Sequence, residues 1–269
     1  MIARIGELAT QSHLPWFAYG ASYDRAMLSI MRGAPDAEQQ AFASFEVGTA
    51  AGQPDASLTF GVELAQIRFD QGRCRELTDA LRATVEANPH IPGFRAVLAQ
   101  SYCETDQLDE ARKVLEPLAA TGFTIQLDWT SAATMLFLAS ASANVHDRNA
   151  AALLYPLLKP VAGQVGVVAS NVLCLGSFSY PCGLLATCLE LWEEAEDYFE
   201  QALAMNAKIG ARPYHVRTRR GYASMLLDRN RPGDCARAAE LIAAAMPEAE
   251  QLGMAREIVV LNRLRQRLN

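Results

Sequence analysis

The densest group of side chains that could bind an anion lies in the stretch GARPYHVRTRRGY, residues 210–222. Arg212 precedes Pro213, and proline is favoured in the first turn of a helix. The free N–H groups of a helix N-terminus and the planar guanidinium group of arginine both bind phosphates and carboxylates. The stretch therefore predicts an anion-binding site at Arg212, His215, Arg217 and Arg220. The alternative is that acidic residues on adjacent helices neutralise the same arginines.

The other reactive residues form no catalytic pattern. The four histidines are far apart, at positions 13, 90, 146 and 215, and neither G-x-S-x-G nor H-E-x-x-H occurs. The six cysteines include no C-x-x-C pair, so we expect mostly reduced thiols in the core rather than metal ligands. The acids of WEEAED, residues 192–197, are adjacent on one helix and are expected to form a solvated face. The sequence thus predicts no catalytic residue, no metal, no cofactor and no enzymatic activity.

Composition limits the partners. The 269 residues contain 24 Lys and Arg against 30 Asp and Glu, a formal charge of −6 that attracts neither nucleic acid nor an anionic membrane. Arg4 and Glu7 interrupt the start of the chain where a secretory signal needs an apolar core, so we expect a cytoplasmic protein. No direct contact with nucleic acid or with a membrane is predicted.

Residues 160–189 contain no charged side chain, although glycines, serines and Pro181 interrupt them. The length would suffice to span a bilayer, but no clean apolar helix can form across these interruptions. We expect a buried connection followed by a core helix. The alternative is that the segment lines an apolar pocket.

Helical patterning dominates the chain, because apolar residues recur at intervals of three and four and alternating β-branched runs are missing. Part of the sequence also repeats itself. Ala65 maps to Ala99, Leu77 to Ala111 and Leu81 to Leu115, each by 34 positions (99 minus 65, 111 minus 77, 115 minus 81), the period of a tetratricopeptide repeat. The pattern predicts an all-α single domain over residues 1–269, a right-handed α-solenoid of about six degenerate tetratricopeptide-like helix pairs.

A second pattern places an alanine 15 positions before a glycine in three segments (52 minus 37, 210 minus 195, 253 minus 238). The small and apolar positions between them also correspond. These sets are Ala37, Ala41, Ser44 and Gly52; Ala195, Phe199, Ala202 and Gly210; and Ala238, Ile242, Ala245 and Gly253. The small residues are expected where paired helices approach closely, and each glycine is expected to end a helix in a left-handed conformation.

Both ends of the chain carry amphipathic segments. Residues 254–269 have an apolar stripe of Ile258, Val259, Leu261, Leu264 and Leu268 with a basic outer face that includes Arg256, and this predicts a polar helix that caps the stack. Residues 1–12 are interpreted as the second helix of a preceding repeat. Its open face is expected either to pair with another copy of the chain, as a homodimer, or to stay flexible.

The concave groove of such a stack is lined by the first helix of each pair, and this predicts the binding residues. Gln66 and Asp70 map by the same shift of 34 onto Gln100 and Glu104. Tyr19, Tyr23 and Tyr180 could add flat anchors to the groove. Solvated polar residues and core aromatics are the alternative interpretations of these positions.

Four segments resemble a known family. They are PWFAYGASYDRAMLSIMRG, AAGQPDASLTFGVELAQIRFDQGR, EARKVLEPLAATGF and CLGSFSYPCGLLATCLELWEEAEDYFEQALAMNAKIGARP. The sequences of these segments resemble the C-terminal helical-repeat region of large bacterial signalling proteins. In those proteins an AAA-type ATPase of the signal-transducing (STAND) class is joined to an adenylate or guanylate cyclase domain or to a LuxR-type DNA-binding domain, as in MalT-like regulators. The resemblance covers nearly the whole chain and is most specific over residues 174–213.

The resemblance implies a sensor or interaction arm for bacterial signalling or transcriptional regulation. It would bind a protein partner or a small regulatory ligand in its groove and act on an attached ATPase, cyclase or LuxR-type domain. The chain itself has no G-x-x-x-x-G-K-[ST] motif. The rival interpretation is a small-molecule-binding protein or enzyme that uses an apolar cavity inside the superhelix.

Overall fold

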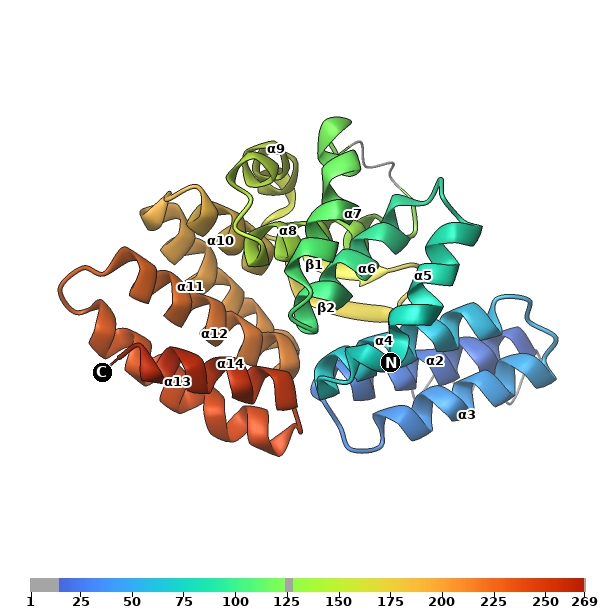
Figure 1. The fold of residues 1–269 in the computed structure, drawn as a ribbon. Coiled ribbons are helices and arrows are strands. Elements are labelled where there is room, and N and C mark those ends of the chain that lie inside the picture. Colours follow the sequence, from blue (N-terminus) through green and yellow to red (C-terminus); the bar gives the residue numbers. More distant parts are fainter. Residues whose placement is uncertain (1–14, 124–127, 269) are drawn as a thin grey trace.

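A computed structural model describes residues 15–123 and 128–268 of the chain (Figure 1). Within these ranges the protein is mainly helical, with thirteen α-helices, two 3-10 turns and one β-hairpin. The α-helices are α2 (Pro15–Arg32), α3 (Ala37–Ala50), α4 (Ala56–Gln71), α5 (Thr78–Ala87), α6 (Pro92–Glu104), α7 (Leu108–Ala120), α8 (Ser131–Asn144), α9 (Arg148–Leu158), α10 (Ser179–Cys188), α11 (Trp192–Ile209), α12 (Arg212–Arg229), α13 (Asp234–Gln251) and α14 (Ala255–Gln266). The other elements are η1 (Cys74–Leu77), η2 (Lys159–Val161), β1 (Val165–Val168) and β2 (Leu173–Ser177).

The helices pack in sequential pairs, as the sequence predicts. Helix α2 packs on α3, α6 on α7, α8 on α9, α10 on α11 and α12 on α13, whereas α5 packs on α6 and is joined to α4 through η1. Helix α14 follows as a thirteenth helix. Helices α6, α8, α10, α12 and α14 also contact one another in turn and form a continuous row, because each pair stacks on the next. The expected segment 1–12, and with it the open helix expected to form a homodimer, lies outside the described residues.

The predicted stacking positions are confirmed by their burial. Ala195, Phe199 and Ala202 are fully buried on α11. The Phe199 ring fills the space above Gly183 and Gly221, where a Cβ atom would lie only 3.0 and 3.1 Å from it. A larger residue at either glycine would push these helices apart, so close helix approach is set by residue size.

The three glycines at the ends of the matching segments also behave as predicted. Gly52, Gly210 and Gly253 have φ angles of +65°, +75° and +66°. This left-handed conformation is unfavourable for residues with a Cβ atom. In each of the three segments, the 15-residue interval therefore runs from a buried alanine near the start of a helix to the glycine that ends it.

The N-terminal helices α2 and α4 meet the C-terminal helices α12 and α14, which the sequence pattern does not predict. Helix α14 contacts α4, and α12 contacts α2, so the N-terminal and C-terminal helices lie side by side (Figure 1). The approach is close: a Cβ at Gly33 would lie 2.6 Å from Leu252, and one at Gly72 would lie 2.8 Å from the backbone nitrogen of Arg256. Pairs stacked in sequence thus close into a compact arrangement.

Helix α14 differs from the expected polar cap. Leu261 and Leu264 are buried as predicted, but Val259 is exposed and Arg256 turns inward. The Arg256 guanidinium pairs with the Asp106 carboxylate, at 2.7 Å from Nη2 to Oδ1. The helix packs on α13 and also reaches α4, because it fills the junction between the two ends of the row.

The all-α prediction is incomplete, because residues 160–189 contain a β-hairpin before the expected core helix. Strands β1 and β2 pair antiparallel, with Val165 opposite Ser177 and Val168 opposite Leu173. All five residues of β2 are buried. Asn206 of α11 joins the hairpin to α12: its Oδ1 accepts the Ser177 N–H at 2.8 Å, and its Nδ2 donates to Thr218 Oγ1 at 3.1 Å.

Within the described ranges, none of the helices combines the length and the apolar character needed to cross a bilayer. The uncharged segment is instead divided between η2, the hairpin and α10.

Candidate functional site

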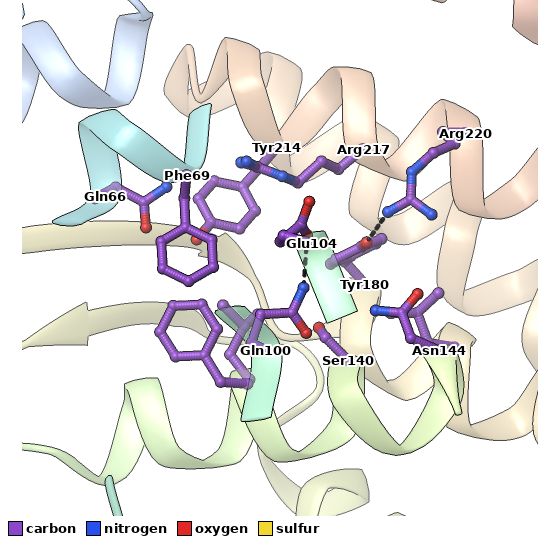
Figure 2. Close-up of a pocket in the computed structure, with 13 residues that line it drawn as sticks. Gln66, Phe69, Gln100, Glu104, Ser140, Asn144, Tyr180, Tyr214, Arg217 and Arg220 are labelled. Carbon is purple, nitrogen blue, oxygen red and sulfur yellow. Dashed lines mark hydrogen bonds between the residues drawn. The ribbon is translucent and has the colours of Figure 1, made fainter. Parts of the chain in front are cut away.

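Two sites that the sequence predicts separately meet at one place in the structure. Gln66, Gln100, Glu104 and Tyr180, expected in a groove, line the same small pocket as Arg217 and Arg220, expected in an anion site (Figure 2). The side chains come from α4, α6, α10 and α12. The pocket has a volume of about 30 Å³, room for a water molecule and little else.

The repeated polar positions make the same hydrogen bond in both repeats. Gln66 Nε2 donates to Asp70 Oδ1 at 3.0 Å, and Gln100 Nε2 donates to Glu104 Oε1 at 2.7 Å. Each pair is separated by one helical turn, the spacing that brings side chains together on a helix. Gln66 and Gln100 are buried and line the small central pocket, so free solvation does not describe these amides.

Carboxylates already hold the two central arginines. Arg217 Nη1 donates to Asp70 Oδ1 at 2.7 Å, and Arg220 Nε lies 2.7 Å from Glu257 Oε2. Glu257 is 3% exposed and joins the two arginines, since its Oε1 lies 3.6 Å from Arg217 Nε. Arg220 Nη2 also donates to the Tyr180 hydroxyl at 3.1 Å. Within the described chain we call Asp70, Glu104, Arg217, Arg220 and Glu257 the central ionic cluster.

The central ionic cluster contains three carboxyl groups and two guanidinium groups. Burial raises the pKa of Asp70, although the Arg217 charge and hydrogen bond oppose the shift. Burial also raises the pKa of Glu104, and the nearby Glu257 charge adds to this effect. Because Asp70 and Glu257 already face both arginines, the neutralisation alternative describes Arg217 and Arg220 better than the anion site.

The predicted anion site is also divided, because its residues lie on two faces of α12. Arg212 and His215 face α13 around Glu248: Arg212 Nε donates to Glu248 Oε1 at 3.0 Å, and His215 Nδ1 lies 3.7 Å from Glu248 Oε2. Burial, and next the Arg219 charge, lower the pKa of His215. The spacing of three and four positions in 212, 215 and 219 gives one face of a helix, whereas 217 and 220 lie on another.

Tyr19 and Tyr23 do not join the other groove residues. They line a separate pocket with Trp16, Trp129 and the tip of the β-hairpin. The expectation that all three tyrosines anchor one groove is not met, because Tyr19 and Tyr23 line one pocket and Tyr180 lines another.

Two open hollows adjoin the small central pocket. One has a volume of about 190 Å³ and is bordered by Asp106 and Arg263, and the other has a volume of about 480 Å³ and is bordered by Thr187, Trp192 and Ser224. All three spaces share Asn144 and Arg220. We call the two open spaces together the inner hollow, since they follow the row α8, α10, α12 and α14.

Glu257 and Asn144 are the important residues that the sequence reasoning misses. A signal exists for Glu257, because it precedes Leu261 and Leu264 by four and seven positions and so shares their buried stripe. A charged residue in such a stripe calls for a buried partner. The sequence gives only a weak signal for Asn144. This residue lies at the end of an apolar helix, and no repeated segment has a corresponding residue.

Four of the six thiols, those of Cys74, Cys103, Cys174 and Cys182, are buried, whereas Cys188 is half-buried and Cys235 is exposed. Burial raises the pKa of Cys103 and of Cys182 to about 12, and that of Cys188 to about 11. High thiol pKa values disfavour the reactive thiolate. Over residues 15–123 and 128–268, the His, Cys, Asp and Glu side chains form no group of three placed to hold a metal ion.

Comparison of the chain with family models, with curated proteins and with solved structures finds no match.

Proposed function

We propose that this chain is a non-catalytic binding module that takes up a segment of a protein partner in its inner hollow. The observation that carries the proposal is an open hollow that is lined by both apolar and polar side chains. It lies next to the paired charges of the central ionic cluster. Trp192 offers an apolar contact, while Asn144, Thr187 and Ser224 offer hydrogen-bonding groups. Such a lining suits a peptide, whose backbone needs hydrogen bonds and whose side chains need apolar contacts.

The central ionic cluster supports this proposal by making the hollow rigid. Arg217 and Arg220 connect α12 to α4 and α10 through charge-assisted hydrogen bonds, and to α14 through ion pairs with Glu257. A rigid surface loses little conformational entropy when it binds a partner. The cluster then acts as a positioning structure, and the partner contacts the residues around its open edge.

The finer architecture also belongs to this proposal. The matching hydrogen bonds of Gln66 and Gln100 and the repeated glycine ends support degenerate tetratricopeptide-like repeats arranged as a right-handed superhelix. The resemblance to helical arms of bacterial signalling proteins supports a cytoplasmic role in which binding acts on an attached ATPase, cyclase or LuxR-type domain. A small regulatory ligand in the same hollow is the alternative occupant.

The test is to block the hollow and measure partner capture. Ser224 is half-buried at the hollow, and Ser57 is exposed on α4, so Ser224→Arg and Ser57→Arg introduce the same side chain at two different places. We expect Ser224→Arg to abolish capture of a partner that the unchanged chain enriches reproducibly, and Ser57→Arg to retain it. Equal capture by both variants would reject the hollow as the binding site.

Native mass spectrometry of the purified chain distinguishes the alternative. A bound small molecule that Ser224→Arg displaces would assign the hollow to a regulatory ligand. A bound molecule that Ser224→Arg retains would place ligand binding elsewhere on the chain.

A further inference from the structure

A second pocket, remote from the central ionic cluster, has walls made of aromatic rings. Trp16 and Tyr19 of α2, together with Trp129 before α8, line a space of about 420 Å³. Tyr23 completes the group, and its ring meets that of Tyr19 edge to face at a centroid distance of 5.2 Å. The volume is in the range of small-molecule sites in proteins.

The mouth of this aromatic pocket is open to solvent. Trp16 is 59% exposed and Trp129 is 40% exposed, although large apolar rings are usually buried. Leu58, also exposed, borders the same space. Clustered apolar exposure around a cavity marks a binding site more often than scattered exposure does.

The charge of the pocket is negative. Asp55 is the only charged side chain among the described residues that line it. Burial raises the pKa of Tyr19 and of Tyr23, and the Asp55 charge raises both pKa values further. The walls thus combine the negative faces of aromatic rings with a carboxylate.

A buried acid lies next to this pocket. Glu63 follows Thr59, a lining residue, by one turn of α4 and is 0% exposed. Neither of its carboxylate oxygens has a hydrogen-bond partner in the described chain. Its charge acts on the Tyr19 phenol, so the two groups are close. Burial raises the pKa of this carboxyl group to about 8 and so favours its neutral form, and a cation bound nearby would favour the ionised form.

We propose that the aromatic pocket binds a small organic cation with a quaternary ammonium group. Such a cation has no N–H donors to satisfy, and its methyl groups pack on aromatic faces that also attract its charge. A primary ammonium would need several hydrogen-bond acceptors, which the mainly apolar walls do not offer. The site is separate from the inner hollow and does not depend on the function proposed for that hollow.

The experiment measures binding of choline by calorimetry and by tryptophan fluorescence. Its control ligand is 3,3-dimethylbutan-1-ol, which has the same shape without the charge. We expect saturable binding of choline, with at least about tenfold weaker binding of the neutral alcohol. Equal affinities would show a merely apolar pocket and would overturn the proposal, as would the absence of saturable choline binding.

Variants locate the site. Trp129→Leu and Asp55→Asn should each weaken choline binding by about tenfold, whereas Trp192→Phe, in the inner hollow, should leave it unchanged. Circular dichroism checks that each variant is folded, and Trp129→Phe should retain part of the affinity. Unchanged binding in Trp129→Leu would overturn the proposal. The proposal would also be overturned if the chain self-associates and Trp129→Leu abolishes this association, because the exposed rings would then contact a second copy of the chain.

Discussion

Arg217 of α12 donates a hydrogen bond to Asp70 of α4 at 2.7 Å, across 147 positions of the sequence. Their side chains are 10% and 15% exposed, so the pair is largely removed from water. Burying two charges is costly, and the cost is offset only where geometry and further hydrogen bonds are good. Gln66 provides one such bond to Asp70, and Glu257 provides a second carboxylate for Arg217. The pair therefore fixes α4, near the N-terminus, against α12.

Removing one member of this pair should destabilise the protein strongly. We expect Arg217→Met to lower the free energy of unfolding by about 3 kcal/mol, since it leaves the Asp70 carboxylate buried without its main partner. Arg265→Met, on the exposed face of α14, is the matched control and should change stability by less than about 0.5 kcal/mol. Urea denaturation followed by circular dichroism measures both. Similar losses in the two variants would mean that the pair does not hold the ends together.

Glu63 should make stability fall as the pH rises. Burial raises its pKa from 4.5 to about 8, so the folded chain keeps a proton that the unfolded chain releases near pH 4.5. The folded state binds more protons between these values, and its stability therefore declines from about pH 4.5 to about pH 8.

Glu63→Gln removes this titration while keeping the size of the side chain. We expect the variant to be more stable than the unchanged chain by roughly 5 kcal/mol above pH 8, with the difference shrinking to below about 1 kcal/mol at pH 5. Glu116→Gln, at an exposed position, should show no such pH dependence. Thermal unfolding over this pH range measures the stability of each protein. A stability difference between Glu63→Gln and the unchanged chain that stays constant with pH would contradict the prediction.

Two glycines with similar backbone angles should respond differently to alanine. Gly176 has a φ of +69°, and a Cβ there would lie 2.8 Å from Asn206 and from Tyr214. Gly210 has a φ of +75° but nothing within 4 Å. Gly210→Ala should cost only the left-handed strain, about 1 kcal/mol, while Gly176→Ala adds a clash and should cost about 3 kcal/mol. Chemical denaturation measures both losses of stability. Equal losses in the two variants would show that the hairpin shifts to accommodate the added Cβ atom.

The thiols should react in an order set by burial. Cys235 is exposed and Cys188 is half-buried, whereas Cys103 and Cys182 are buried with pKa values raised to about 12. Iodoacetamide at pH 8 should label Cys235 at least about 100-fold faster than Cys103 or Cys182. Peptide mass spectrometry over time measures the rates. Cys188 borders the inner hollow, so a bound partner should slow its labelling, and rapid labelling of Cys182 in the folded chain would contradict the placement of α10.

The repeated residues let the sequence predict the local architecture well. Helix pairing follows from Ala195, Phe199 and Gly210 and their counterparts, because size and backbone conformation act within one or two helices. The polar pair Gln66 and Asp70 is likewise visible as a match to Gln100 and Glu104, because it recurs at the repeat period. The agreement has limits: Leu98 and Ala99 are buried, but their counterparts Leu64 and Ala65 are only half-buried.

The sequence by itself determined the helices, their pairing and the positions where they approach closely, since these depend on periodic patterns and on residue size. Tertiary structure alone decided that the row closes and brings Asp70, Arg217 and Glu257 together, because the contact of distant ends depends on the summed rotation of many helix pairs. It also decided that residues 165–177 form a hairpin, since β2 is buried on both faces and lacks an alternating pattern. Small angular differences between pairs add up along the chain, and no local pattern encodes their sum.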